Sequence, residues 1–233
     1  MKSAPILAAK DVQKSFGATP ALCGATVEIQ RGEVLAIMGP SGSGKTTLLH
    51  CLAGILLPDA GHVLFHGSNL ETMSDSARTK LRRSQFGFVF QFGQLIPELT
   101  ALENIAFPLL LNGQSRKLAF NTAAHWMERL GLSESKAQRA GELSGGQAQR
   151  VAIARAMAIR PTILFADEPT GSLDSLTSER AMVLFLDTVR SSGTTLVIVT
   201  HDPRIAAYAD REIIVRDGIV VTTGRGLSDR ESL

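Results

Sequence analysis

The sequence predicts an α/β domain with a mostly parallel sheet, an N-terminal antiparallel β region and an inserted helical subdomain. Short apolar runs that end in polar residues are typical of buried parallel strands. A glycine-rich loop follows the first such run, and helix-capping patterns occupy the middle of the chain. The runs that carry the sheet prediction are 34–38, 86–90, 163–166 and 196–199. Because ligands bind at the carboxyl ends of strands in such sheets, the polar residues after these runs are expected to form one site.

The size and composition suit one domain. The chain has 233 residues, 44% hydrophobic and 20% charged. We expect a single domain over 1–233, with a core of about 1–92 and 161–233 and a helical subdomain of about 93–160. The net charge of +2 is small and the basic residues are scattered along the chain, so the composition does not favour nucleic-acid binding. No apolar run approaches the ~18 residues of a membrane span. If the protein works at a membrane, we expect another chain to supply the membrane-spanning segments.

Capping signals predict where the other elements begin. Thr100 and Glu103 have the spacing of a capping box, which predicts a helix that begins there. The other expected elements are helices over 119–130 and 145–159 and a hairpin around Asp-Gly over 213–221. Cys51 lies in an apolar run and is expected to be buried, and the two cysteines suggest no disulfide framework.

Residues 39–46 read Gly-Pro-Ser-Gly-Ser-Gly-Lys-Thr and match G-x-x-x-x-G-K-[ST] at every fixed position. The loop follows a predicted strand and opens an apolar helix, which distinguishes a phosphate loop from an ordinary glycine-rich turn. Its backbone N–H groups suit phosphate oxygens, Lys45 adds a point charge, and the Thr46 hydroxyl can ligate Mg²⁺. The residues expected to bind ATP here are Gly39, Ser41, Gly42, Ser43, Gly44, Lys45, Thr46 and Thr47.

An acidic pair, Asp167 and Glu168, directly follows the run 163–166. An acidic pair can simply begin a loop. When it follows a buried strand in a chain that also has a phosphate loop, a role in nucleotide hydrolysis is the favoured interpretation. Asp167 is expected to bind Mg²⁺ through water. Glu168 is expected to act as the base or polarising group for the attacking water.

Two further segments place polar groups at helix starts. Residues 143–150 read Leu-Ser-Gly-Gly-Gln-Ala-Gln-Arg, and Ser144 has N-cap spacing to Gln147. A helix that begins there presents its N-terminal N–H groups outward, where they suit a phosphate. His201 follows the run 196–199 and precedes Asp-Pro, a good N-cap and N1 pair.

The order of these motifs resembles that of the ATP-binding-cassette (ABC) ATPases. The matching segments are the phosphate loop, Gln91, 143–147, Asp167-Glu168, Ser172-Leu173-Asp174 and His201, within a span from about Leu7 to about Val221. The resemblance implies a P-loop NTPase core that hydrolyses ATP with Mg²⁺. It also implies that Gln91 senses the metal and contacts a transmembrane partner, and that His201 is a switch histidine at the γ-phosphate.

The resemblance further implies a head-to-tail homodimer with two shared ATP sites. In that family, the residues that match Ser144, Gly145, Gly146 and Gln147 complete the ATP site of the facing subunit. A cap at Ser144 cannot easily reach the phosphate loop of its own chain across a helical insert, which agrees with this arrangement. Phe16 stands where the family places an adenine-stacking aromatic, most often Tyr, and the alternative is a core Phe.

The sequences of residues 86–105 and 167–174 are similar to those of one subgroup of ABC ATPases. Its members power lipoprotein release, macrolide export, bacitracin resistance and a cell-division permease. The implied function is an ATPase subunit that drives a separate permease in export, extrusion or mechanotransmission. Such a subunit binds peripherally at the cytoplasmic face of the cell membrane. Phe92 and Leu95, beside Gln91, are the expected permease contacts. The alternatives are an amino-acid importer ATPase and a soluble or scaffolding ABC ATPase.

Overall fold

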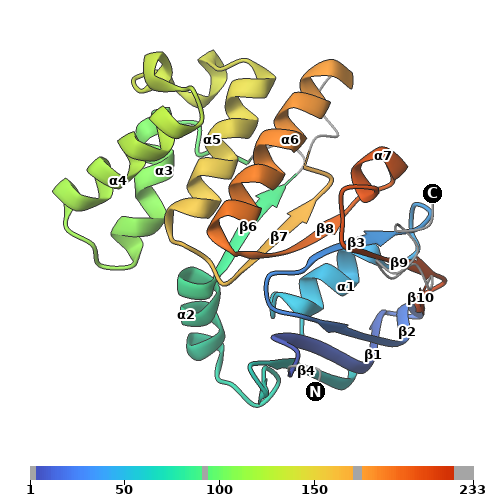
Figure 1. Cartoon of the computed structure of the whole chain (residues 1–233). Helices are drawn as coiled ribbons and strands as arrows, with labels where there is room; N and C mark the ends of the chain where they lie inside the picture. Colours follow the sequence, from blue (N-terminus) through green and yellow to red (C-terminus); the bar gives the residue numbers. More distant parts are fainter. Residues whose placement is uncertain (1–3, 91–93, 170–174, 223–233) are drawn as a thin grey trace. The chain divides into compact units, whose positions relative to one another are not determined.

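The computed structural model describes residues 4–90, 94–169 and 175–222 of the chain. The chain folds as two compact units (Figure 1). The first unit comprises 1–82 and 195–233, and the second comprises 83–194. The predicted boundaries of the helical subdomain, at about 93 and 160, stay a prediction.

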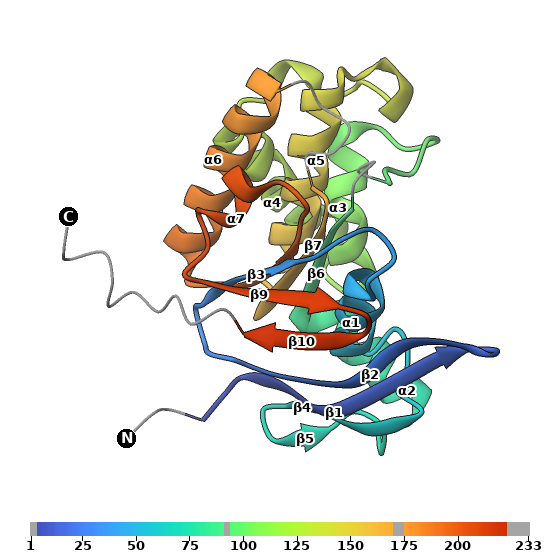
Figure 2. The ribbon, with the colours of Figure 1, turned by 90° about the vertical axis from the view of Figure 1, so that its right-hand side faces the viewer.

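An antiparallel sheet forms the N-terminal part of the first unit, as predicted (Figure 2). Its strands are β1 (Leu7–Phe16), β2 (Thr19–Ile29), β4 (Ala60–Phe65) and β5 (Ser68–Asn69), in the order β2-β1-β4-β5. The pairing of β1 shifts register after Ala9, where Asp11 has a φ of 50°. Gly61 of β4 lies against this bulge, and a Cβ on it would lie 2.3 Å from the Asp11 carbonyl oxygen. Close backbone approach therefore requires glycine at this point.

A second group of strands in the first unit is mainly parallel. Its strands are β3 (Val34–Met38), β8 (Thr195–Val199), β9 (Arg211–Arg216) and β10 (Ile219–Thr222). β3 pairs in parallel with β8 on one side and β9 on the other. β9 and β10 form the predicted hairpin (Figure 2), with Asp217 at a φ of 51° and Gly218 at 74°. Positive φ at both turn residues matches the twist of the two strands.

Two parallel strands of the first unit, β3 and β8, are apolar along most of their length and lie in its buried core. Every residue from Val34 to Ile37 and from Leu196 to Val199 is buried. Helix α1 (Lys45–Leu52) follows β3 and buries its own apolar face, including Cys51. Burial raises the pKa of the Cys51 thiol to about 11, so the thiol stays protonated and unreactive at neutral pH. The other helices here are α2 (Asp75–Gln85), which continues into the second unit, and α7 (Pro203–Ala206).

The second unit combines two parallel strands with a helical cluster. β6 (Phe86–Phe90) pairs in parallel with β7 (Ile163–Asp167). The helices are α3 (Ala101–Leu111), α4 (Arg116–Arg129), α5 (Gly145–Ala158) and α6 (Ser175–Ser192), with short 3₁₀ turns η1 (Ser133–Ser135) and η2 (Ala140–Glu142). α3, α4 and α5 contact one another (Figure 1). The mixed α/β fold class is confirmed.

The helix starts predicted at Thr100 and Ser144 are present, whereas the helix expected over 119–130 begins earlier, at Arg116, because the Ser115 hydroxyl caps it by accepting from the Leu118 N–H. The Thr100 hydroxyl accepts from the Glu103 N–H, and a Glu103 carboxylate oxygen accepts from the Thr100 N–H at 2.9 Å. Asn104, fully buried, accepts from the Ile96 N–H and donates to the Ile96 carbonyl oxygen. The segment before α3 is thus held by side-chain hydrogen bonds. Among the described residues, no helix is both long enough and apolar enough to cross a membrane.

Candidate functional site

The glycine-rich loop between β3 and α1 is shaped by close backbone contacts. Gly39, Gly42 and Gly44 have φ values of 142°, 76° and 103°. A Cβ on Gly39 would lie 2.1 Å from the Val215 carbonyl oxygen, and one on Gly44 would lie 2.3 Å from the Ala21 carbonyl oxygen. Neither neighbour can retreat, because both are backbone atoms of strands. Glycine at 39 and 44 therefore fixes the loop against β9 and β2.

The hairpin turn between β9 and β10 supports the same loop from another side. The Gly218 N–H donates to the Ser43 carbonyl oxygen at 3.0 Å, and the Gly218 carbonyl accepts from the Cys23 N–H at 2.9 Å. These bonds connect the loop to β2 through the turn. A loop held on several sides can present its N–H groups to a ligand without a large loss of conformational entropy when the ligand binds.

Lys45 and Ser43 supply the polar groups of the loop. Lys45 Nζ donates to the carbonyl oxygens of Gly39 and Pro40, at 2.9 and 2.8 Å, so the ammonium group lies across its own loop. The Ser43 hydroxyl is buried and has no hydrogen-bond partner among the described residues. Thr46 is exposed in the first turn of α1. A cation, an unpaired hydroxyl and a helix N-terminus together fit a polyphosphate.

We predict that Gly39→Ala impairs both stability and ATP binding. The left-handed backbone alone costs a non-glycine residue about 1–2 kcal/mol, and the contact with the Val215 carbonyl adds to this. Gly32→Ala is the matched control, since Gly32 has a φ of 74° and a Cβ added there would meet nothing within 4 Å. Thermal denaturation should show the larger loss for Gly39→Ala, and calorimetry should show weakened ATP binding only there. Equal stability losses would contradict the clamped loop.

His201 lies just beyond β8, next to the strand that leads into the loop. The β3–β8 register pairs Ile37 with Val199, and the Thr200 N–H donates to the Ile37 carbonyl at 3.2 Å. The carboxyl ends of these two strands are therefore side by side, as predicted. Asp202 caps α7, and its hydrogen bonds from the Arg204 side chain and backbone hold the pKa of this carboxyl below its usual value. His201 itself is exposed.

In the second unit, the acidic pair lies at the end of β7. Phe90, the last residue of β6, pairs with Asp167. β6 therefore ends beside the strand that carries the acidic pair. Phe165 stacks with Phe88 at a distance of 5.7 Å between ring centres, so the two strands also contact each other through their side chains. Glu168 has a φ of 47°, in the left-handed region. A residue with a side chain adopts this conformation at a cost of about 1–2 kcal/mol. Strain of this kind is concentrated at functional sites.

Ser144 is the N-cap of α5, as predicted. Its hydroxyl accepts from the Gln147 N–H at 3.3 Å, and the Gln147 side-chain oxygen accepts from the Ser144 N–H at 2.8 Å. The Gln147 amide also donates to the Ser135 hydroxyl at 3.1 Å, which anchors the cap to η1. Ser144 and Gly145 are exposed. The positive end of the α5 dipole and its first N–H groups are thus presented outward.

The aromatic residue expected to stack on adenine is accessible. Phe16, at the end of β1, is 53% exposed, which excludes the alternative of a core phenylalanine. Its stacking role stays a prediction. Three other predictions, for Gln91, Phe92 and Ser172-Leu173-Asp174, lie outside the described residues.

Sequence reasoning missed Arg155. It lies in α5, and its guanidinium donates to the Gln94 carbonyl oxygen at 2.8 Å. Burial lowers the pKa of this guanidinium. The bond ties the segment that follows Gln91 to the helix that Ser144 caps. A single cation inside the apolar stretch 151–158 is the signal that could have identified it.

The site residues divide between the two units. The phosphate loop and His201 belong to the first unit, and Asp167, Glu168 and 144–147 belong to the second. Within each unit, strand register brings the ends of neighbouring strands together. The assembly of both groups into one site stays a prediction.

Comparison with known proteins extends over nearly the whole chain. The ABC transporter family model matches residues 22–171. The chain is 43% identical to the lipoprotein-releasing system ATP-binding protein LolD of Porphyromonas gingivalis, over 92% of this chain and 98% of that one. It is 42% identical to LolD 2 of Caulobacter vibrioides, over 93% and 96% of the two chains.

Solved structures give the same result. The dimeric, post-hydrolysis ATP-binding cassette MJ0796 bound to ADP and Pi superposes with a TM-score of 0.85 at 38% identity, over 95% of this chain and all of that one. CbiO1 of Clostridium perfringens, part of an ABC transporter complex, also has a TM-score of 0.85, at 32% identity over 94% and 88% of the two chains. This chain therefore belongs to the ABC transporter family and is an ATP-binding, ATP-hydrolysing cassette.

Proposed function

We propose that the chain is the energy-coupling ATPase subunit of a membrane complex that releases or exports lipoprotein-type substrates. It works as a head-to-tail dimer with two shared Mg-ATP sites. The observation that carries this proposal is the outward-facing cap of α5, in which Ser144 and Gln147 bond each other and leave the first helical N–H groups exposed. Helix N-termini suit phosphate, and this chain already has a phosphate loop of its own, so we assign this second helix start to the ATP site of a neighbouring chain.

The phosphate loop binds the β- and γ-phosphates of ATP. Its N–H groups are preset by Gly39 and Gly44, and Lys45 exchanges its bonds to the loop carbonyls for bonds to phosphate. Phe16, exposed at the end of β1, offers a π face to the adenine. The nucleotide is thereby held at both ends.

Mg²⁺ fits the oxygen donors that the chain supplies. The exposed Thr46 hydroxyl and the Asp167 carboxylate at the end of β7 are hard oxygen donors, the type that this ion prefers, and Gln91 is the third proposed donor. When bound, the ion neutralises charge on the phosphate oxygens. Asp167 is well suited to hold it, because the β6–β7 pairing fixes the strand end.

Glu168 orients the attacking water and accepts its proton at a carboxylate oxygen. The strained backbone at Glu168 sets the direction in which this side chain leaves the strand. His201 donates to the γ-phosphate oxygens from the end of β8. Ser144, Gly145, Gly146 and Gln147 of a second chain close over the same phosphate. The dimeric state of MJ0796 bound to ADP and Pi supports this arrangement.

The relatives support the proposed cargo. LolD proteins of Porphyromonas gingivalis, Caulobacter vibrioides and Bacteroides fragilis, at 42–44% identity, are named as ATP-binding proteins of lipoprotein-releasing systems. We therefore favour this class over amino-acid import and over a soluble scaffold. The chain would then bind at the cytoplasmic face of the cell membrane through a separate permease, which contains the substrate pocket.

We predict that docking to the permease requires the segment after Gln91. Replacing Phe92 and Leu95 by Asp should abolish co-purification with the permease, because charged side chains cannot enter an apolar contact. Leu118→Asp is the matched control, since Leu118 is a 54% exposed leucine on α4. ATPase assays with and without permease-containing membranes should show stimulation in the control only. Persistent co-purification of the double variant would place the docking surface elsewhere.

A further inference from the structure

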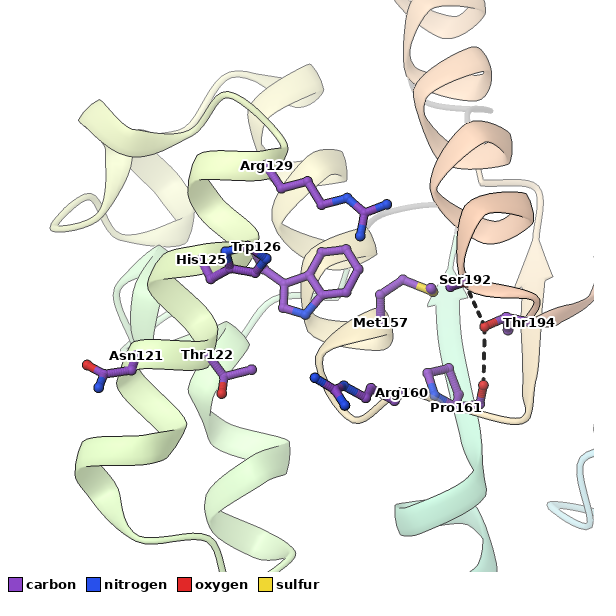
Figure 3. A pocket seen from close by; sticks show the side chains of 10 residues that line it. All are labelled: Asn121, Thr122, His125, Trp126, Arg129, Met157, Arg160, Pro161, Ser192 and Thr194. Atoms are coloured by element: carbon purple, nitrogen blue, oxygen red, sulfur yellow. Dashed lines mark hydrogen bonds between the residues drawn. The ribbon is translucent and has the colours of Figure 1, made fainter.

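A cavity in the second unit lies away from the acidic pair. It has a volume of about 530 Å³ and is lined from α4, from the end of α5 and the residues that follow it, and from the end of α6 (Figure 3). Arg160 and Pro161, which precede β7, form part of its wall, whereas Asp167 is the last residue of that strand. The cavity is therefore at the amino end of β7, opposite the end that carries the catalytic candidates.

The lining of this cavity carries the guanidinium groups of Arg129 and Arg160. The His125 ring also lines it, and no Asp or Glu is among its lining residues, all of which are described. Trp126 and Met157 add an apolar wall, and Figure 3 shows Trp126 projecting from α4 toward Met157. Cavities of 300–1,000 Å³ with a few polar groups on an apolar wall are typical of small-molecule sites.

Arg129 is held in place over the tryptophan. Its guanidinium carbon lies 5.1 Å from the centre of the Trp126 ring, and one of its nitrogens donates to the Ser191 hydroxyl at 2.7 Å. Trp126 is 8% exposed. A cation fixed by a ring and a hydroxyl needs little reorganisation to receive an anion.

Arg160 occupies a position that favours glycine. It follows Ile159, the C-cap of α5, and has a φ of 52°. Glycine adopts this conformation at the end of helices without strain, whereas arginine does not. The Arg160 side chain forms no hydrogen bond or ion pair with the described residues, so it does not cap the last carbonyls of α5. Neither local conformation nor capping explains this residue, and its side chain lines the cavity.

We propose that this cavity binds a small aromatic phosphate monoester. Arg160 binds the phosphate group, since a guanidinium group pairs with phosphate through parallel N–H bonds. The ring packs against the apolar wall of Trp126 and Met157. The site shares no residue with the proposed ATP site and lies at the end of β7 opposite Asp167.

Trp126 provides a direct readout, because it is the only tryptophan of the chain. We expect phenyl phosphate to change the tryptophan fluorescence in a saturable way, with an affinity at least roughly tenfold higher than that of phenol or inorganic phosphate. Lys45→Ala should bind phenyl phosphate equally well, which separates this site from the phosphate loop. No saturable change with the wild-type chain would overturn the proposal, as would loss of the change in Lys45→Ala.

Variants of Arg160 distinguish binding from folding. Arg160→Gly should weaken phenyl phosphate binding roughly tenfold or more while raising the Tm, because glycine relieves the left-handed backbone. Arg116→Gln is the matched control, since Arg116 also lies over an aromatic ring of α4, that of Phe120 at 5.0 Å, but outside the cavity. It should bind like the wild type. Unchanged binding in Arg160→Gly would overturn the proposal.

Discussion

Glu168→Gln is expected to lower the ATPase rate by about 10²–10⁴-fold while ATP still binds. The amide has nearly the same shape as the carboxylate but cannot accept the proton of the attacking water. The left-handed backbone at position 168 disfavours Gln as much as Glu, so the substitution leaves the backbone strain unchanged. Phosphate release under saturating ATP measures the rate, and calorimetry measures binding. Glu134→Gln, an exposed carboxylate in η1, is the control and should keep full activity.

The same variant tests the two-chain site. With hydrolysis blocked, Glu168→Gln should elute from a sizing column as a dimer in Mg-ATP and as a monomer without nucleotide. Adding Ser144→Arg should abolish the dimer, because the exposed cap of α5 would then place a bulky cation against the facing phosphate loop. Hydrolysis at the wild-type rate would remove Glu168 from its catalytic role. A variant that stays monomeric in ATP would show that the isolated chain does not form the shared site.

Lys45→Ala is expected to weaken ATP binding by about 1.5–3 kcal/mol, or roughly 10- to 150-fold in Kd. The ammonium group supplies the main point charge of the loop. Among the described residues its hydrogen-bond partners are the neutral carbonyl oxygens of Gly39 and Pro40, which a charged phosphate can replace. Calorimetric titration with ATP measures the loss. Lys136→Ala, which removes an exposed cation from the second unit, should bind normally, and an unchanged Kd in Lys45→Ala would exclude the loop as the ATP site.

Much of the secondary structure could be predicted because its signals are local. The buried strands β3, β6, β7 and β8 appear as apolar runs, and the caps at Thr100 and Ser144 each depend on a residue three positions away. The Asp-Gly turn of the β9–β10 hairpin is equally local. Parallel pairing then follows from the burial of both sheet faces, which is why the strand ends meet in pairs.

The residues of the candidate site could be predicted from the sequence, but the contacts that hold them in place could not. The phosphate-loop pattern identifies Gly39 and Gly44 but not the backbone oxygens of Val215 and Ala21 that exclude any other residue there. Those contacts join segments far apart in sequence, and no periodicity encodes them. The same holds for the bond from Arg155 to the Gln94 carbonyl, which spans 61 positions.

The sequence by itself determined the fold class, the elements that have a local signal and the family, because hydrophobic period, caps and motif order are properties of short stretches. Only the tertiary structure decided three other features: the clamp on the phosphate loop, the strained backbone of Glu168 and the cationic cavity of Arg129 and Arg160. The clamp and the cavity depend on the packing of distant segments. A position such as 160, where arginine takes a conformation that favours glycine, is ordinary in the sequence and significant only when its surroundings are known.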